Sequence, residues 1–441
     1  MKLCEIKCSM LNKLLYITAS VVSLLFCGNL YANDGGNAKQ QSHIDSLSGN
    51  VFTDNNNNFN VILVDKHTST LYSVIVKDTV PYIVQDYKVI TGGNNGSKVK
   101  EGDLKTPEGF YFVTKYIPPD KLDHKLFGDG ALTLNYPNIV DKNMGRTGHG
   151  IWIHGMGEER NDNKTKGCVA LQNKDFEQLK TFLILGTPVI ISEHLHFLNK
   201  DEYMKKKKKY MDIFKKFITS WEKGDYEGFA SFFDTKFKGE ANGNTAQQYL
   251  AEKKKLMKIY PHRKVVTSDL NIFTENSSAI MYKFNQLYCA DNVLSYGTKL
   301  LYLTGGGARG DEYKVVAEEF NKMDVDPIIA QHVTHLVSKW RAAWAAKDIE
   351  KYMSHYSAAF SSDGMNAKQW KAHKKGLFKA SRSLKVHIKD IKFKVLSGKR
   401  IEVTFIQEYT SDTVSDKGLK TLVLHGCPGD YKIIEESWRH I

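Results

Sequence analysis

The feature that most constrains the fold of this chain is an internal duplication in its C-terminal half. Residues 213–237 match residues 336–360 at a constant offset of 123, and later pairs such as Gln286 and Gln407 lie 121 residues apart. In each copy, apolar residues first recur at helical spacing and then alternate with polar residues, as in helices followed by strands. Helices followed by an antiparallel sheet predict one α+β module in two copies.

The two copies share aromatic positions, such as Trp221 in the first and Trp344 in the second. We place the modules at residues 200–322 and 331–441. Their pattern resembles the NTF2-like cone, in which a curved sheet wraps a long helix and leaves a pocket. Since that superfamily includes enzymes, ligand binders and docking modules, the resemblance implies a fold and assigns no role. Four residues are expected to line the two pockets: Gln286, Tyr288, Gln407 and Tyr409.

The region before the repeats has the pattern of short strands. Residues 61–64 and 70–76 are runs of β-branched, aliphatic and aromatic residues, and Gly92 with Gly93 supplies a turn. We therefore predict a mainly-β domain over residues 59–193. At 441 residues, the chain is long enough for this domain and the two modules.

The N-terminal segment has the composition of an export signal. Three lysines precede or begin a short apolar run over residues 14–27, and Ala32 stands before a polar stretch. We predict a signal peptide over residues 1–32 and a flexible leader over the Asn-rich and Gly-rich residues 33–58. The expected location is the periplasm or cell envelope. An uncleaved N-terminal membrane anchor is the alternative.

Cleavage after Ala32 would leave three cysteines in the mature chain, namely Cys168, Cys289 and Cys427. Three cysteines cannot all pair, so at least one thiol is left over in an oxidising compartment. Cys289 and Cys427 do not occupy equivalent places in the two repeats, and we interpret them as buried apolar residues. A disulfide between them is the alternative.

The formal net charge of +13 favours association with polyanions or with an anionic surface. The basic residues are dispersed and no recognised nucleic-acid motif accompanies them, which argues against nucleic acid as a partner. The anionic polymers of a bacterial envelope fit the charge. The lysine run at residues 205–209 begins a predicted amphipathic helix, and we interpret it as a solvated face rather than a binding patch.

One histidine and one cysteine of the β domain are spaced suitably for thiol catalysis. A predicted strand ends at His154, and after a loop Gly167 precedes Cys168. A thiolate is the nucleophile in such sites, and a nearby imidazole lowers the thiol pKa and takes up its proton. Gly167 lets the backbone approach a reacting carbonyl, so that local N–H groups can hold an oxyanion. We predict Cys168 as the nucleophile and His154 as its base.

These residues resemble the signature of the L,D-transpeptidase (YkuD) family, which is His-Gly, a loop, and then Ser/Thr-x-Gly-Cys. His154-Gly155 and Thr165-Lys166-Gly167-Cys168 match it in order and spacing. The resemblance extends over most of residues 59–193, with further matching segments at residues 61–65, 91–93, 102–111 and 135–138.

The resemblance implies a β-sandwich-like catalytic domain that transfers acyl groups through a thioester on Cys168. The nucleophile would attack the bond between meso-diaminopimelate and the terminal D-alanine of a peptidoglycan tetrapeptide stem. The Gly155 carbonyl would orient His154, and the Thr165 hydroxyl would brace the nucleophile loop. No cofactor and no metal are expected. Four further residues are expected beside the substrate or behind the catalytic pair: Lys166, Trp152, Tyr136 and His149, of which His149 is interpreted as an exposed strand residue.

The chain departs from the family pattern next to the nucleophile. Many members have His before the Gly-Cys pair and Arg or Asn two residues after the Cys, where this chain has Lys166 and Ala170. The missing hydrogen-bonding group leaves the acyl acceptor open. A YkuD domain followed by an NTF2-like domain also resembles the L,D-carboxypeptidases of curved and helical Gram-negative bacteria, although those carry a single NTF2-like copy.

Three functions are therefore compatible with the sequence. The first is L,D-transpeptidation, with an amine as acceptor. The second is L,D-carboxypeptidation by the same nucleophile, with water as acceptor and an effect on cell shape. The third is an inactive wall-binding or docking protein, against which the intact His154 and Cys168 argue. In each case peptidoglycan stem peptides are the expected partner, and the modules are expected to bind wall glycan, peptide or an envelope protein.

Overall fold

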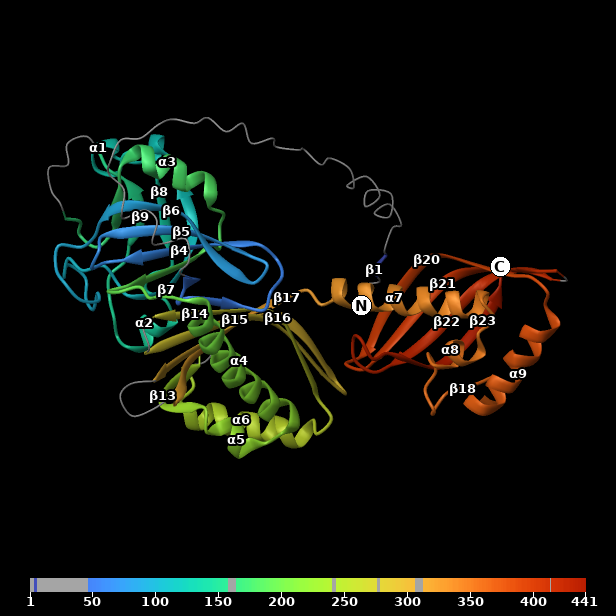
Figure 1. Ribbon diagram of the computed structural model, residues 1–441. Helices are drawn as coiled ribbons and strands as arrows, with labels where there is room; N and C mark the ends of the chain where they lie inside the picture. The colour runs from blue at the N-terminus through green and yellow to red at the C-terminus, as the bar shows by residue number, and fades with distance from the viewer. Residues whose placement is uncertain are drawn as a thin grey trace.

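The computed structural model describes residues 4–5, 47–157, 164–239, 243–275, 278–305, 312–412 and 414–441. The predicted signal peptide, apart from residues 4–5, and the predicted leader up to residue 46 lie outside this part of the chain. Figure 1 shows a barrel that rests on the first module, with the second module to one side. Within the described ranges, no helix is both long and apolar enough to cross a membrane.

The catalytic region forms a closed eight-stranded barrel in the order β10-β6-β5-β4-β11-β7-β8-β9. The expected mainly-β domain is confirmed. The barrel consists of two sheets, which are joined where β10 pairs with β6 and where β7 pairs with β8. The strands are β4 (Phe59–Asp65), β5 (Thr70–Lys77), β6 (Val80–Ile90), β7 (Gly109–Ile117), β8 (Ala131–Leu134), β9 (Trp152–Gly155), β10 (Val169–Leu171) and β11 (Pro188–Ser192). Short helices lie between them: η2 (Pro119–Lys121), α1 (His124–Phe127), α2 (Ile139–Asn143) and α3 (Asn173–Phe182).

Strands β4 and β11 are buried on both faces, which explains their uninterrupted apolar sequence. Ile62 and Val64 point into the barrel core. The alternate residues Val61 and Leu63 pack instead with Phe273, Met281 and Tyr302 of the first module. The period of two along a strand therefore divides these side chains between two cores.

The first module contains three helices and a six-stranded sheet in the order β13-β17-β16-β15-β14-β3. Its aromatic helix stripe packs on the sheet, with Phe214 next to Tyr282 and Phe284. The helices are α4 (Lys200–Lys223), α5 (Tyr226–Ala230) and α6 (Ala246–Ile259). The strands, besides β3, are β13 (Phe233–Gly239), β14 (Lys264–Glu275), β15 (Ala279–Ala290), β16 (Val293–Gly305) and β17 (Tyr313–Met323).

The predicted flexible leader needs a correction, because its last part is folded. Strand β3 (Val51–Thr53) pairs with β14, and β2 (Leu47–Ser48) pairs with β12 (Phe197–Leu198). Phe52 is fully buried and stacks on Tyr203. Among the surrounding polar residues, the three apolar residues Leu47, Val51 and Phe52 formed no recognisable strand pattern. They become covered only when their strands pair with β12 and β14, which are distant in the sequence.

The second module repeats the order of the first, which confirms the expected pair of α+β modules. Three helices precede strands β20 to β23 of the sheet β1-β20-β21-β22-β23, whose edge strand β1 comes from the N-terminus. The helices are α7 (Asp326–Ala345), α8 (Ile349–Met353) and α9 (Ala367–Ala380). The strands are β1 (Cys4–Glu5), β20 (Leu384–Ser397), β21 (Arg400–Ser411), β22 (Ser415–His425) and β23 (Lys432–His440), with the short pair β18 (Ser361–Ser362) and β19 (Met365–Asn366) beside them.

A disulfide between Cys289 and Cys427 joins the two modules. Both cysteines are buried, but their interpretation as unpaired apolar residues was wrong and the alternative holds. Cys289 lies on β15 and Cys427 lies in the loop between β22 and β23, so comparison of equivalent positions in the repeat could not indicate the bridge. Ion pairs between Lys264 and Asp430, and between Lys399 and Asp291, cross the same junction.

Replacing both Cys289 and Cys427 with alanine is expected to destabilise this junction. Removing a cross-link over 138 residues costs about 2–5 kcal/mol, because the unfolded chain gains conformational freedom. Calorimetry should show a lower unfolding midpoint, and Cys168→Ala serves as the control that leaves the bridge intact. An unchanged midpoint, together with reduced thiols at both Cys289 and Cys427 in the parent protein by mass spectrometry, would contradict the bridge.

Candidate active site

His154 and Cys168 lie on neighbouring parallel strands of the barrel. His154 belongs to β9 and pairs with Ala170 of β10. Cys168 precedes β10 and lies two residues before Ala170, so it faces the same side of the sheet as His154. Residues 158–163 of the connection between them lie outside the described residues. Strand pairing thus brings together the two residues that the sequence singled out.

The main-chain carbonyl of Gly155 determines which nitrogen of His154 carries the proton. His154 Nδ1 lies 2.7 Å from Gly155 O, and the imidazole is buried. A carbonyl oxygen can only accept, so Nδ1 must donate, and in the neutral ring it is Nε2 that keeps the lone pair. A neutral imidazole with Nε2 deprotonated is the form needed by a general base. The contact implied by the family resemblance is therefore present.

Phe127 and Asn173 hold this part of β9 in place, and sequence reasoning missed both. The Phe127 ring packs edge to face on the His154 ring, with the two ring centres 5.1 Å apart. The centre of the Phe127 ring also lies 5.0 Å from that of the half-buried Trp152. A side chain at Gly155 would collide with Asn173 Oδ1, at 2.3 Å from the added Cβ. Phe127 lies at the end of a four-residue helix and belongs to no periodic pattern, so nothing in the sequence indicated its role.

Cys168 is half-buried and its sulfur does not take part in a disulfide. Its Sγ lies 3.4 Å from Gly150 O, so the thiol hydrogen can be donated to that carbonyl. The Thr165 hydroxyl donates to Cys168 O at 2.6 Å and accepts from Gly167 N at 3.0 Å. The brace expected from Thr165 is therefore present on both sides of the nucleophile.

Gly167 is required for a different reason from the one we expected. Its N–H is directed at Thr165, so it is not aimed at a reacting carbonyl. Its φ is +128°, and an added Cβ would lie 2.7 Å from the carbonyl oxygen of Lys105. Only glycine accommodates both the backbone conformation and this close approach. The expectation that local N–H groups hold an oxyanion therefore concerns N–H groups of this loop other than that of Gly167.

The loop that carries Lys105 is held by the carboxylate of Asp103. Lys98 Nζ donates to it at 2.8 Å, and the backbone N–H groups of Val99, Lys100 and Lys105 donate as well. Burial by itself would raise the pKa of Asp103, but these hydrogen bonds hold the pKa well below its ordinary value. The matching segment at residues 102–111 thus forms the support on which the nucleophile loop rests.

The remaining site residues divide into two groups. Tyr136 is buried and its hydroxyl donates to Thr147 O at 3.1 Å, which anchors the segment before β9. Burial, followed by the nearby Asp141, raises the pKa of Tyr136 to about 12, so the hydroxyl stays protonated. Lys166 is exposed beside the nucleophile. The side chain of His149 is 86% exposed, as interpreted, but the residue lies in the loop before β9 and not on a strand.

A group of potential metal ligands in the described residues lies on other strands of the barrel. His67 follows β4, and Glu193 and His194 follow β11, with their ligand atoms within 4.8 Å of one another. Lys66 Nζ is 3.4 Å from the Glu193 carboxylate and competes with any cation there. We assign no metal to this group.

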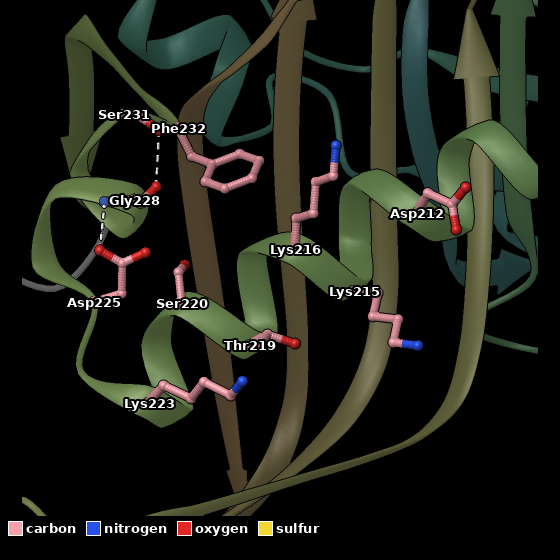
Figure 2. Close-up of a pocket in the computed structure, with 10 residues that line it drawn as sticks. All are labelled: Asp212, Lys215, Lys216, Thr219, Ser220, Lys223, Asp225, Gly228, Ser231 and Phe232. Carbon is pink, nitrogen blue, oxygen red and sulfur yellow. Dashed lines mark hydrogen bonds between the residues drawn. The ribbon is translucent and has the colours of Figure 1, made fainter.

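A basic groove of about 670 Å³ runs beside α4 in the first module. Figure 2 shows Lys215 and Lys216 extending in different directions from the helix, and Asp225 accepting from Gly228 N. Farther toward the start of α4, Lys208 is exposed and pairs with Asp212. The interpretation of residues 205–209 as a solvated face holds for Lys205 and Lys208 but not for Lys207, which is half-buried and donates to Thr79 of the barrel.

Two families of known proteins match separate parts of this chain. Residues 60–191 match the L,D-transpeptidase catalytic domain (YkuD). Residues 209–319 and again residues 332–437 match the Cds6 C-terminal NTF2-like domain. The first match covers the barrel and the other two cover the repeated modules, one in each copy.

Individual relatives match the barrel alone or a larger part of the chain. YafK of Escherichia coli (strain K12), named as a candidate L,D-transpeptidase, is 30% identical over 132 residues, which are 29% of this chain and 49% of YafK. The chain thus spans about half the length of this curated relative. The structure of Bdellovibrio bacteriovorus Bd1075 is 29% identical, with a TM-score of 0.57 over 64% of this chain and 99% of that chain. Pgp2 of Campylobacter jejuni, described as a helical cell shape determining protein, is 28% identical, with a TM-score of 0.51 over 62% of this chain and 94% of its own.

Replacing Asp103 with asparagine is expected to destabilise the barrel at neutral pH. The folded-state pKa of Asp103 lies below its unfolded value of 3.8, so the carboxylate stabilises the fold above that value. This stabilisation is lost as the pH falls through the folded-state pKa. Thermal unfolding should show a midpoint lowered by roughly 3 °C at pH 7 and a smaller difference below pH 3. Asp120→Asn on the exposed η2 is the matched control, and a difference that does not depend on pH would contradict the assignment.

Replacing Thr165 with valine is expected to slow the alkylation of Cys168 by iodoacetamide about tenfold at pH 7. The loss of two hydrogen bonds, each contributing about 1 kcal/mol, leaves the nucleophile loop less firmly placed beside His154. Thr181→Val on the exposed surface of α3 is the control and should react like the parent protein. Equal rates for all three proteins would show that the brace does not control the reactivity of the thiol.

Proposed function

We propose that this chain, which carries an L,D-transpeptidase (YkuD) catalytic domain followed by two NTF2-like domains, is an exported cysteine acyltransferase that acts on peptidoglycan tetrapeptide stems. The observation that carries the proposal is the hydrogen bond from His154 Nδ1 to the Gly155 carbonyl. It leaves Nε2 as a base on the strand next to Cys168. A thiol beside a correctly protonated imidazole supports nucleophilic acyl transfer.

The proposed reaction proceeds in two halves through a thioester. Cys168 gives its proton to His154 Nε2, and Sγ bonds to the carbonyl carbon that links diaminopimelate to the terminal D-alanine. The C–N bond then breaks, and the leaving amine of D-alanine takes the proton from His154. In the second half, an acceptor loses a proton to His154 and attacks the thioester, and the Cys168 thiol is restored.

The resting site offers a main-chain acceptor to each partner. Gly150 O can accept the thiol hydrogen of Cys168, and the Gly155 carbonyl accepts from His154 Nδ1, so that Nε2 is the basic nitrogen of the neutral ring. The proton then moves when a substrate carbonyl approaches Sγ, so a permanent thiolate is not needed. The half-buried position of Cys168 admits a peptide while the buried His154 is shielded from bulk water.

The acceptor distinguishes transpeptidation, our first candidate, from carboxypeptidation, our second. Ala170, which pairs with His154, is fully buried and offers no hydrogen-bonding side chain beside the nucleophile. Without such a group to hold an acceptor amine, water gains an advantage. The similarity to Pgp2, described as a cell shape determining protein, also favours trimming of tetrapeptide to tripeptide stems.

We place the reaction in the periplasm or cell envelope, where these stems occur, with the two modules positioning the barrel on the wall. The net charge of +13 supports attraction to an anionic envelope. The tight packing of β4 and β11 on the first module supports a fixed geometry between the barrel and that module.

Incubation of the protein with purified tetrapeptide muropeptides, followed by mass spectrometry, tests the reaction. The parent protein should convert the tetrapeptide stems, and Cys168→Ala should be inactive. His154→Ala should lose about 10²–10⁴ in kcat, because the general base is removed. His149→Ala is the matched histidine control and should keep full activity, since its side chain is exposed.

The products separate the candidate functions. Tripeptide stems and free D-alanine indicate a carboxypeptidase, whereas cross-linked dimers or exchanged D-amino acids indicate a transpeptidase. An unchanged substrate with every variant, including the parent protein, would contradict enzymatic activity and favour a docking role.

A further inference from the structure

The two modules differ in how the first edge of each sheet is covered. In the first module, edge strand β14 pairs with β3, and its outward side chain Phe273 packs against the barrel. The equivalent edge strand of the second module is β20, with 14 residues. In the described part of the chain, its outer edge pairs with the two residues of β1 alone (Figure 1). Val395 and Leu396, near the end of β20, are 41% and 44% exposed. A long open edge is a template for another strand.

The strands on the two edges occupy the same position in the repeat. Strand β3 sets Phe52 opposite Ile272. Strand β1 sets Cys4 opposite Phe393, and both pairings are antiparallel. Phe393 follows Ile272 by 121 residues, which is the offset between the two copies. Each module therefore has a place for an added strand at the same point of its edge.

A bulge lies next to this place in both modules. The bulge residue is Asp269 in β14 and Asp390 in β20, and each has a φ of +55°. In the first module, Asn57, which follows β3, donates a hydrogen bond from Nδ2 to Asp269 at 3.2 Å. Asp390 is exposed beside the pairing position of β20 and offers the same carboxylate. The repeat thus conserves the bulge together with the place for a strand.

The inner side of an added strand has to be apolar. In the first module, Phe52 of β3 is fully buried and stacks on Tyr203. In the second module, Phe393 is 5% exposed and belongs to the core, against which the half-buried Ile391 packs. A strand that adds to β20 therefore needs an apolar residue opposite Phe393.

The outer side of the edge differs in charge between the two copies. Lys392 and Lys394 flank the buried Phe393, so they lie on the outer face of β20. The equivalent residues of β14 are the uncharged Asn271 and Phe273. Opposite charges directly across two strands stabilise the pairing, and like charges destabilise it. The edge of β20 therefore favours a strand with acidic residues opposite the two lysines. A second copy of β20 is disfavoured there, because its lysines would meet these.

The strand that now occupies this place belongs to the predicted signal peptide. The register of β1 puts Glu5 opposite Lys392, which matches an acidic residue to a lysine. The expected cleavage after Ala32 removes β1 and keeps β3, which lies after it in the sequence. In the exported protein, the edge of the first module therefore stays covered while that of the second module becomes open.

We propose that the open edge of β20 binds an extended segment of a partner protein, in which one apolar residue stands between two acidic residues. The segment adds to the sheet as an antiparallel strand. Its apolar residue lies opposite Phe393, and its acidic residues lie opposite Lys392 and Lys394. Main-chain hydrogen bonds provide the affinity, and the alternation of side chains provides the specificity. This docking does not involve Cys168 and goes beyond acyl transfer.

Titration of the chain that begins at Asn33 with three synthetic peptides tests the proposal. The first peptide is Glu-Val-Glu-Val-Glu. The second has lysine in place of each glutamate, and the third has proline in place of each valine. The third keeps the charge of the first but lacks two of the N–H groups that a strand needs. By fluorescence anisotropy, the first should bind roughly tenfold more tightly than either control, because it alone combines strand pairing with opposite charges. Hydrogen exchange should show protection of residues 384–397 by the first peptide.

Variants of the edge locate the binding. Lys392→Glu combined with Lys394→Glu should weaken binding of the first peptide roughly tenfold and strengthen binding of the lysine peptide, because opposite-charge pairs become like-charge pairs. Lys375→Glu combined with Lys379→Glu, at exposed positions of α9, changes the net charge by the same amount and should leave binding unchanged. Cys168→Ala should bind like the parent protein.

Three results would overturn the proposal. Equal binding of the valine and proline peptides would show attraction by net charge without strand pairing. Unchanged binding by a folded protein with both lysines replaced would place the peptide elsewhere. No binding of the first peptide would show that the lysines only keep the edge from pairing. Circular dichroism separates a loss of binding from a loss of fold, and if the double variant is unfolded, the proline peptide and hydrogen exchange decide the question. None of these readouts depends on turnover, so failure here is distinguishable from failure of the proposed acyl transfer.

Discussion

The arrangement of the first two domains depends on the burial of two barrel strands from both sides. Along β4, Ile62 and Val64 fill the barrel while Val61 and Leu63 fill the interface with the first module. A strand buried in this way cannot change its register by one residue without exchanging two apolar layers. The barrel and the first module therefore share one mechanical unit, and a truncation after residue 200 would expose the outer layer to water.

The candidate site inherits this rigidity through a short series of backbone contacts. The Asp103 carboxylate accepts hydrogen bonds from N–H groups of its loop, and the carbonyl of Lys105 in that loop lies against Gly167. Thr165 then ties Gly167 to the carbonyl of Cys168. Most of these contacts involve main-chain atoms, so the nucleophile is positioned by the path of the chain. Such preorganisation reduces the rearrangement needed when a substrate arrives.

Much of this organisation could be predicted from the sequence, for reasons that also explain the failures. The barrel strands and the duplication are local patterns of period and offset, and the pair His154 and Cys168 lies within a specific motif. Phe52 could not be assigned to a strand, because its burial comes from the edge of a sheet more than 200 residues away. The disulfide could not be predicted for a similar reason, because it depends on how the two folded modules pack against each other. The close approach of the Lys105 carbonyl to Gly167 could not be foreseen either, because a motif shows which residue is needed and not which atom lies against it.

The two modules keep the same kind of buried ion pair, although the residues around it differ between the copies. Glu318 and Glu436 each need a lysine and a tyrosine hydroxyl to remain charged inside the cone. The hydroxyl comes from helix α6 in the first copy and from Tyr356, after α8, in the second. Each carboxylate thus keeps a lysine and a tyrosine hydroxyl, although the place of Tyr249 is taken by Trp370 in the second copy. A partner lost at one position of the repeat is supplied from another element, so the buried ion pair is kept while the residues around it differ.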